Sequence, residues 1–138
     1  MQTKPLSILI ADDDLEDIEL MKHTILSLAP QALVNHVLNG KEVIDLLSGC
    51  SDNELPHLMI LDYNMPRMTG LEVLSMLNAE KRYSKIIKLI LSTSASKIHI
   101  KQCLVNGARD YFIKPGNIKE LEMLTRKMLA LSLQADPI

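Results

Sequence analysis

Short runs of apolar residues alternate along the chain with longer segments in which apolar residues recur every three or four positions. An unbroken apolar run is typical of a strand buried on both faces, as in a parallel sheet, whereas the second pattern is typical of an amphipathic helix. The strands are predicted at residues 6–11, 32–38, 58–61, 86–91 and 110–113, and the helices at 14–28, 41–47, 70–80, 97–106 and 117–133. This alternation predicts an α/β fold, a five-stranded doubly wound parallel sheet with helices on both faces.

Residues with special backbone roles mark the ends of several helices. Pro30 ends the first helix, and Gly107 follows the fourth helix where a left-handed cap is favoured. Asn117 and Glu120 have the spacing of a capping box at the start of the last helix. The last helix is expected to direct four apolar residues toward the core: Ile118, Leu121, Leu124 and Met128.

Polar residues follow most of the predicted strands. They are Asp12 and Asp13 after the first strand, Asp62 after the third, Ser92 after the fourth and Lys114 after the fifth. The carboxyl ends of parallel strands meet at one edge of a sheet, which is where open α/β sheets bind ligands. We therefore expect these five side chains to converge.

The converging side chains predict a phosphoryl site with a metal ion. Three carboxylates close together repel one another, and a cation relieves that repulsion. Oxygen ligands without His or Cys favour a hard divalent ion, so Mg²⁺ is the expected cofactor. The Lys114 ammonium and the Ser92 hydroxyl fit the oxygens of a phosphoryl group. Asp62 is then the attacking carboxylate, which forms an aspartyl phosphate.

Each of these residues also has an ordinary structural interpretation. Asp12 and Asp13 suit the positive amino end of the helix that follows them. Ser92 is a reasonable turn residue, and Lys114 a reasonable solvated loop lysine. Their joint occurrence at successive strand ends favours one shared site over separate structural roles.

Taken together, these motifs resemble those of the response regulator receiver domains of two-component signalling. The resemblance covers almost the whole chain. It is carried by five motifs: the acidic pair Asp12-Asp13, the acceptor motif at residues 62–70, the switch hydroxyl of Ser92, the switch aromatic Tyr111 and the Lys-Pro motif Lys114-Pro115. Ser92 replaces the commoner Thr, and Ile87 stands where Pro is frequent. Neither departure removes a group that the site needs. Tyr111 has the alternative of being only a packed aromatic residue.

The resemblance implies a flavodoxin-like sheet with strand order 2-1-3-4-5 and a role for each motif residue. Asp62 is the residue phosphorylated by a sensor histidine kinase or a histidine phosphotransfer protein. The remaining implied roles are Mg²⁺ binding by Asp13, Asp62 and the backbone carbonyl of Asn64, with Asp12 acting through a water; phosphoryl binding by Ser92 and Lys114; and switching by Ser92 and Tyr111.

Length and charge add expectations about partners. A chain of 138 residues has the length of one domain, and its net charge of −2 predicts no nucleic-acid or membrane binding. The resemblance implies one receiver domain over residues 1–138, with no separate output domain. Its two cysteines lack metal-ligand spacing and are expected to be reduced thiols in a cytoplasmic protein. We expect no enzymatic role beyond assisting its own phosphorylation and dephosphorylation.

The phosphorylation signal is then expected to be passed on by binding to a protein partner. The resemblance places the binding face on the fourth helix, the fifth strand and the fifth helix, with a homodimer as a further possibility. The exposed polar residues expected on that face are Lys97, Lys101, Arg109, Lys119 and Arg126.

Two other classes of protein share parts of the pattern. Haloacid-dehalogenase-like phosphatases use a strand-end Asp, a second Asp two residues later, Mg²⁺ and a lysine, and Asp12 and Asp14 have that spacing. However, the chain has no room for a cap domain, and no acidic pair follows Lys114 at a later strand end. An FMN-binding flavodoxin needs a hydroxyl- or Gly-rich phosphate loop after the first strand, where this chain has three aspartates.

Overall fold

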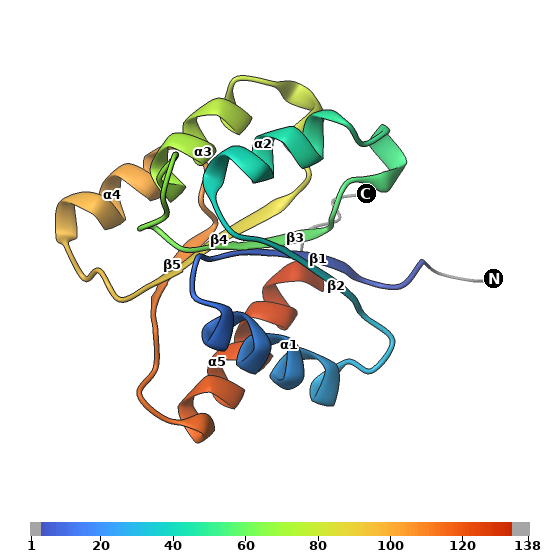
Figure 1. The fold of residues 1–138 in the computed structure, drawn as a ribbon, viewed down its shortest axis with the longest axis vertical. Coiled ribbons are helices and arrows are strands. Elements are labelled where there is room, and N and C mark those ends of the chain that lie inside the picture. Colours follow the sequence, from blue (N-terminus) through green and yellow to red (C-terminus); the bar gives the residue numbers. More distant parts are fainter. Residues whose placement is uncertain (1–3, 134–138) are drawn as a thin grey trace.

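The computed structural model describes residues 4–133 and contains one five-stranded parallel sheet (Figure 1). The strands lie in the order β2-β1-β3-β4-β5, and their bounds are β1 Ser7–Ala11, β2 Leu33–Val37, β3 Leu58–Leu61, β4 Ile87–Ser92 and β5 Asp110–Ile113. The predicted fold class and strand order are confirmed. Residues 1–3 and 134–138 of the domain expected over 1–138 lie outside the described residues.

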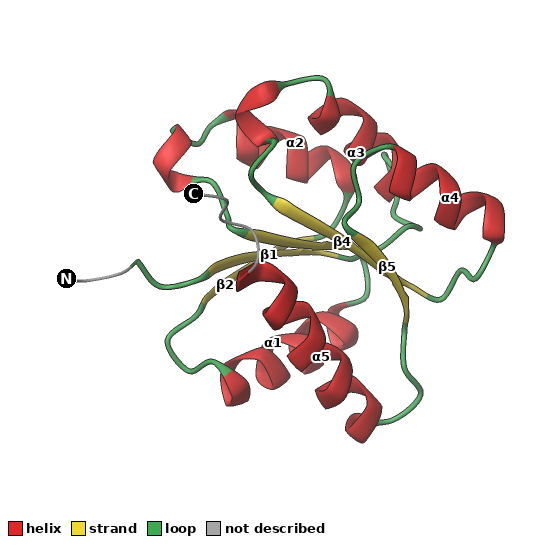
Figure 2. Cartoon of the chain, turned by 180° about the vertical axis from the view of Figure 1, so that it is seen from behind, coloured by secondary structure: helices red, strands yellow, loops and turns green. Residues whose placement is uncertain are grey.

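Helices cover both faces of the sheet. Their bounds are α1 Leu15–Leu28, α2 Gly40–Ser48, α3 Gly70–Asn78, α4 Lys97–Val105 and α5 Ile118–Leu133. Figures 1 and 2 show α1 and α5 together on one face, and α2, α3 and α4 on the other. Two short 3₁₀ helices, η1 Asp52–Glu54 and η2 Lys81–Tyr83, lie in segments where the sequence predicts no element. Among residues 4–133, no helix combines the length and the apolar character needed to cross a bilayer.

The strand residues divide between two hydrophobic cores, one on each face of the sheet. In the central strand β3, Leu58 and Ile60 join the core under α1 and α5, while Met59 and Leu61 join the core under α2, α3 and α4. All four are buried, as expected for a strand covered on both faces. β3 is therefore rigidly held, and the residue that follows it has a fixed position.

Two side chains depart from the apolar patterns of their elements. Lys88 interrupts the apolar run of β4 but is buried, and its Nζ donates hydrogen bonds to the backbone oxygens of Tyr83 at 2.9 Å and Ile86 at 3.2 Å. The prediction that Ile118 faces the core is wrong, because this first residue of α5 is 58% exposed. The helix reaches the sheet only further along, where Leu121 is buried.

Side-chain caps fix where the helices begin next to the carboxyl edge of the sheet. Asp14 caps α1 by accepting hydrogen bonds from the backbone N–H groups of Glu16 and Asp17. Asn117 accepts from the N–H of Glu120 at 2.9 Å, as its spacing predicts. The loop between β1 and α1 is therefore very short, and it holds Asp12 and Asp13 at the sheet edge.

Candidate functional site

Three carboxylates meet at the carboxyl edge of the central strands. Asp12 follows β1 and Asp62 follows β3, and these two strands are neighbours in the sheet. Ligand oxygens from Asp12, Asp13 and Asp62 all lie within 4.8 Å of one another. Asp12 and Asp62 are buried and Asp13 is exposed. The structure thus brings together the three acids that the sequence predicts at this edge.

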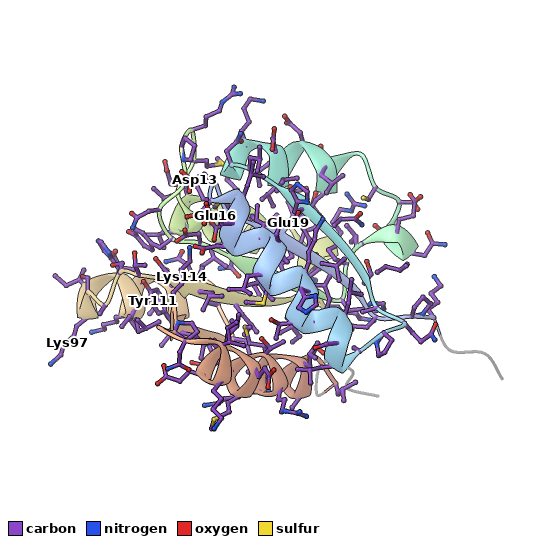
Figure 3. All side chains as sticks on the ribbon, turned by 60° about the horizontal axis from the view of Figure 1, so that its bottom comes forward. Asp13, Glu16, Glu19, Lys97, Tyr111 and Lys114 are labelled. Carbon is purple, nitrogen blue, oxygen red and sulfur yellow. The ribbon has the colours of Figure 1, made fainter. Side chains whose placement is uncertain are left out.

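Lys114 joins this cluster from the loop after β5. Its Nζ lies 2.8 Å from Asp12 Oδ2 and 3.2 Å from Asp62 Oδ2. A third carboxylate, Asp17 of α1, contacts the same ammonium group at 2.7 Å. Figure 3 shows Lys114 beside the amino-terminal end of α1, where Asp13, Glu16 and Glu19 are labelled.

The sequence pattern does not predict the contact between Lys114 and Asp17. Asp17 lies in the first turn of α1, one turn beyond the end of β1. The available signal is its position: the helix begins at the same sheet edge as Asp12, so first-turn side chains can reach the site. The sequence pattern alone does not fix which of them does.

Backbone N–H groups hold the other oxygens of the two buried carboxylates. Asp12 Oδ1 accepts from the N–H of Asp14 at 2.9 Å, and Asp62 Oδ1 accepts from the N–H of Asn64 at 3.2 Å. In each case the remaining oxygen, Oδ2, faces Lys114. Both carboxylates are therefore oriented by one backbone donor and one cation. The role predicted for the Asn64 carbonyl stays a prediction.

Burial and charge act in opposite directions on the ionisable groups of the cluster. Burial raises the pKa of Asp12, and hydrogen bonds from Lys114 and from the Asp14 N–H only partly offset this. Burial alone lowers the pKa of Lys114, but the hydrogen bonds to Asp12 and Asp17 and the charge of Asp62 reverse that and raise it. The lysine is therefore a permanent cation, and the acids around it carry more negative charge than it can balance.

This donor set fits a hard divalent cation. The three clustered acids provide carboxylate oxygens, the ligands that Mg²⁺ and Mn²⁺ prefer, and no His or Cys belongs to the group in the part of the chain that the structure describes. One of the three acids is exposed, so an ion can enter from solvent.

Ser92 lies at the end of β4, next to β3, and is fully buried. Its Oγ accepts a hydrogen bond from the N–H of Ser94 at 3.2 Å, and its backbone oxygen accepts one from the N–H of Lys114 at 2.9 Å. Ser92 thus connects the Lys114 segment to the loop that leads into α4.

Tyr111 points inward and contacts this same loop. It is 9% exposed, and its hydroxyl donates a 2.7 Å hydrogen bond to the backbone oxygen of Ser94. Tyr111 is therefore a packed aromatic residue that also carries a specific polar contact with the segment between Ser92 and α4.

A second aromatic contact near the site is not among the sequence-based predictions. The ring of Tyr63, the residue after Asp62, stacks on the ring of His99 in α4, with centroids 4.2 Å apart and an interplanar angle of 11°. His99 Nδ1 lies 3.1 Å from Ser94 Oγ. The segment that follows β3 is therefore coupled to α4 directly. Nothing in the apolar pattern marks this pair, because it depends on how a loop packs against a helix.

Gly70 allows α3 to begin against the backbone of Asp62. A Cβ at this position would lie 2.6 Å from the Asp62 backbone oxygen, too close for any other residue without a shift. The Gly70 N–H also donates to the Tyr63 oxygen at 2.9 Å. The loop after β3 is closed tightly by these contacts, and this holds Asp62 in place.

Known proteins match most of this chain in sequence. A family model described as the response regulator receiver domain matches residues 8–126. The two-component response regulator ORR5 of Oryza sativa subsp. japonica is 31% identical over 122 residues, which cover 88% of this chain and 87% of the relative. A chemotaxis protein CheY homolog of Campylobacter jejuni subsp. jejuni is 30% identical over 110 residues, which cover 80% of this chain and 82% of the relative.

Solved structures share the fold. The phosphorylated cyanobacterial phytochrome response regulator RcpA superposes with a TM-score of 0.86 at 24% identity, covering 96% of this chain and 97% of its own. The Mn²⁺-bound form of response regulator Rcp1 gives a TM-score of 0.82 at 22% identity, covering 97% of this chain and 99% of its own.

Proposed function

This chain belongs to the response regulator receiver domains of two-component signalling, and from that premise we propose that Asp62 accepts a phosphoryl group. The donor is a histidine kinase or a histidine phosphotransfer protein. The observation that carries the proposal is the position of Asp62. It directly follows the central strand β3, with Asp12 after one neighbouring strand, Ser92 at the end of the other, and Lys114 in contact.

The transfer step uses groups that are already oriented. An oxygen of the Asp62 carboxylate forms a bond to phosphorus while the nitrogen–phosphorus bond of phosphohistidine breaks, and the imidazole nitrogen leaves with the electron pair. The Lys114 ammonium, 3.2 Å from Asp62 Oδ2, offsets negative charge on the transferred group. The chain thus acts as a substrate that assists its own modification, in a signalling role.

Mg²⁺ fits the neighbouring acids. We assign its side-chain ligands as Asp13 and Asp62, with the Asn64 backbone carbonyl as a further ligand and Asp12 acting through a water. The ion supplies positive charge to the phosphoryl oxygens when it is bound. The chain's own residues hold the two buried acids in place through the N–H groups of Asp14 and Asn64.

The acceptor assignment is tested by chemical phosphorylation. We expect acetyl phosphate with Mg²⁺ to add the mass of one phosphoryl group to the wild-type chain, measured on the intact protein. Asp62→Asn should lose this addition, because no other strand-end carboxylate is flanked in the same way. Asp45→Asn, on the exposed side of α2, is the matched control and should be labelled like the wild type.

Labelling of Asp62→Asn to the wild-type extent would refute the assignment. Labelling lost only in Asp12→Asn would point to the phosphatase alternative.

We also propose how the signal leaves the site. The Ser92 hydroxyl, which now accepts from Ser94, donates to a phosphoryl oxygen and draws the loop at residues 93–96 with it. That loop is held by Tyr111 and leads directly into α4. The loop and helix then have two arrangements, and phosphorylation shifts the population between them.

The output face is formed by α4, β5 and α5 and receives a protein partner or a second copy of the chain. Apolar side chains are exposed on α4, among them Ile98 at 69% and Val105 at 73%. Lys97 extends into solvent at the start of this helix (Figure 3). A partner can bury the apolar residues and pair with the surrounding lysines.

Backbone amide shifts measured with and without beryllofluoride test this route. We expect changes at the acid cluster and also along residues 93–105 and at Tyr111. Ser92→Ala should keep the changes at the cluster and lose most of those in α4, because the hydroxyl that follows the phosphoryl group is gone. Ser84→Ala, an exposed serine at the opposite edge of the sheet, serves as control. Shifts confined to Asp12, Asp13 and Asp62 in the wild type would exclude the route.

A further inference from the structure

The Lys114 ammonium has no unused hydrogen-bond donor. A lysine ammonium carries three N–H groups, and Nζ contacts three separate carboxylates: Asp12, Asp17 and Asp62. Phosphorylation converts the Asp62 carboxylate into an acyl phosphate, so the donor on Asp62 can pass to the phosphoryl group, and a further bond to a phosphoryl oxygen must replace the contact with Asp12 or Asp17. The carboxylate that releases the lysine determines the free energy needed for the lysine to bind the phosphoryl group.

Exposure identifies the carboxylate that gives way. The side chain of Asp12 is 8% exposed, whereas that of Asp17 is 43% exposed. A buried carboxylate that loses its cation is left uncompensated, which is strongly unfavourable. Water can replace the lysine at Asp17. Asp17 is therefore the contact that can be released at low cost.

The site also has space for this movement. A cavity of about 60 Å³ adjoins the cluster and is lined by Asp12, Asp17, Asp62 and Lys114, together with apolar residues of α1, the sheet and α5. Lys114 can therefore change partners by a rotation of its flexible side chain, with the helices and the sheet left in place.

We propose that Asp17 opposes the phosphorylated state by competing with the phosphoryl group for Lys114. This inference rests on the proposed phosphorylation of Asp62. In the unphosphorylated chain, Asp17 holds Nζ toward α1 at 2.7 Å, the shortest of the three contacts. The phosphoryl group carries up to about two negative charges but replaces the single charge of the Asp62 carboxylate, so the cluster gains about one negative charge. The phosphoryl group must draw the lysine away from Asp17 and tolerate the nearby Asp17 carboxylate. Asp17 thereby sets how much of the phosphorylated form accumulates.

Beryllofluoride affinity measures this competition. Beryllofluoride is titrated into the wild type and into Asp17→Asn at saturating Mg²⁺, and binding is monitored through the backbone amide chemical shifts. Since half-exposed ion pairs contribute about 1 kcal/mol, we expect Asp17→Asn to bind beryllofluoride about fivefold more tightly. Asp17→Glu keeps the charge within reach of Lys114 and should return the affinity toward the wild-type value. Glu19→Gln removes the same charge from an exposed position on α1 and should leave the affinity unchanged.

A second measurement separates competition from a purely structural role. Without Mg²⁺ or beryllofluoride, Asp17→Asn should unfold at a slightly lower temperature, because an ion pair is lost. Competition thus predicts lower stability of the free chain together with tighter beryllofluoride binding. If Asp17 only supports the fold, stability and affinity fall together.

The outcomes distinguish this inference from the proposal it rests on. Unchanged or weaker beryllofluoride binding by Asp17→Asn, with normal binding by the wild type, overturns the role of Asp17 alone. A gain in affinity of the same size in Glu19→Gln also overturns it, because the effect would then be one of net charge. If the wild type binds no beryllofluoride, or if Asp62→Asn binds it equally well, the proposed phosphorylation of Asp62 fails, and the inference fails with it.

Discussion

Lys88 and Lys114 are both largely removed from solvent, yet their surroundings move their pKa values in opposite directions. Lys114 lies among three carboxylates, which raise its pKa. The Lys88 ammonium donates to the uncharged backbone oxygens of Tyr83 and Ile86, and burial lowers its pKa. Lys114 is therefore suited to bind an anion, while Lys88 joins η2 to β4.

The lowered pKa of Lys88 predicts a pH-dependent stability. Between its folded-state pKa and the ordinary value of 10.5, the unfolded chain binds more protons than the folded chain, so the free energy of unfolding rises with pH. Lys88→Met lacks this contribution. We expect the wild type to gain stability relative to Lys88→Met as the pH rises from neutral toward 10.5, measured by urea denaturation. Lys85→Met, at an exposed position, is the control. Parallel pH profiles for the wild type and Lys88→Met would contradict the prediction.

The sequence reveals those site residues that directly follow an apolar run. Asp12, Asp62, Ser92 and Lys114 all do so, and strand direction alone brings them to one edge. Asp17 does not: whether it or another first-turn acid reaches Lys114 depends on the rotational phase of α1 against the sheet. The rotation of α1 about its own axis is fixed by how the helix packs on the sheet, and the spacing of residues within the helix does not determine it.

At the scale of whole elements, the strength of the hydrophobic pattern decides what the sequence predicts. The five strands and five helices were predictable, with ends displaced by one or two residues, because each buries a continuous face or a regular stripe. The 3₁₀ helices η1 and η2 were not predicted. Each has three residues, too few to show a period.

The start of α3 is the element boundary on which the site depends most. Gly70→Ala should lower the free energy of unfolding by about 1–3 kcal/mol, because the added methyl group meets the Asp62 backbone oxygen. It should also reduce labelling by acetyl phosphate, since Asp62 must shift. Gly116→Ala is the matched control, because nothing lies within 4 Å of a Cβ there. Denaturant titration and intact mass measure the two effects. Equal behaviour of the two variants would show that the boundary does not hold Asp62.

At the scale of the whole molecule, the acid cluster links stability to metal concentration. A ligand that binds only the folded chain stabilises it by about 2.7 kcal/mol at one hundred times its dissociation constant. We therefore expect Mg²⁺ to raise the unfolding temperature of the wild type. In Asp13→Asn the rise should be much smaller, while the metal-free protein should be slightly more stable than the wild type because one like charge is gone.

Glu16→Gln provides the comparison for this prediction, since it removes a charge from the same end of α1 without removing a member of the acid cluster. Its response to Mg²⁺ should match that of the wild type in thermal unfolding. A Mg²⁺ response that is the same in Asp13→Asn would exclude Asp13 as a ligand.

The stack of Tyr63 on His99 has a practical consequence for spectroscopy. The chain contains no Trp and three Tyr, so tyrosine dominates its near-ultraviolet absorption and emission. Tyr63 lies beside Asp62 against α4, and Tyr111 binds the loop before α4. Tyr83, beneath the Arg82 guanidinium at the opposite edge of the sheet, provides a constant background. The unlabelled protein therefore carries its own optical reporter: a movement of α4 that breaks the Tyr63–His99 stack and the Tyr111–Ser94 hydrogen bond is expected to change the signal of two of its three tyrosines.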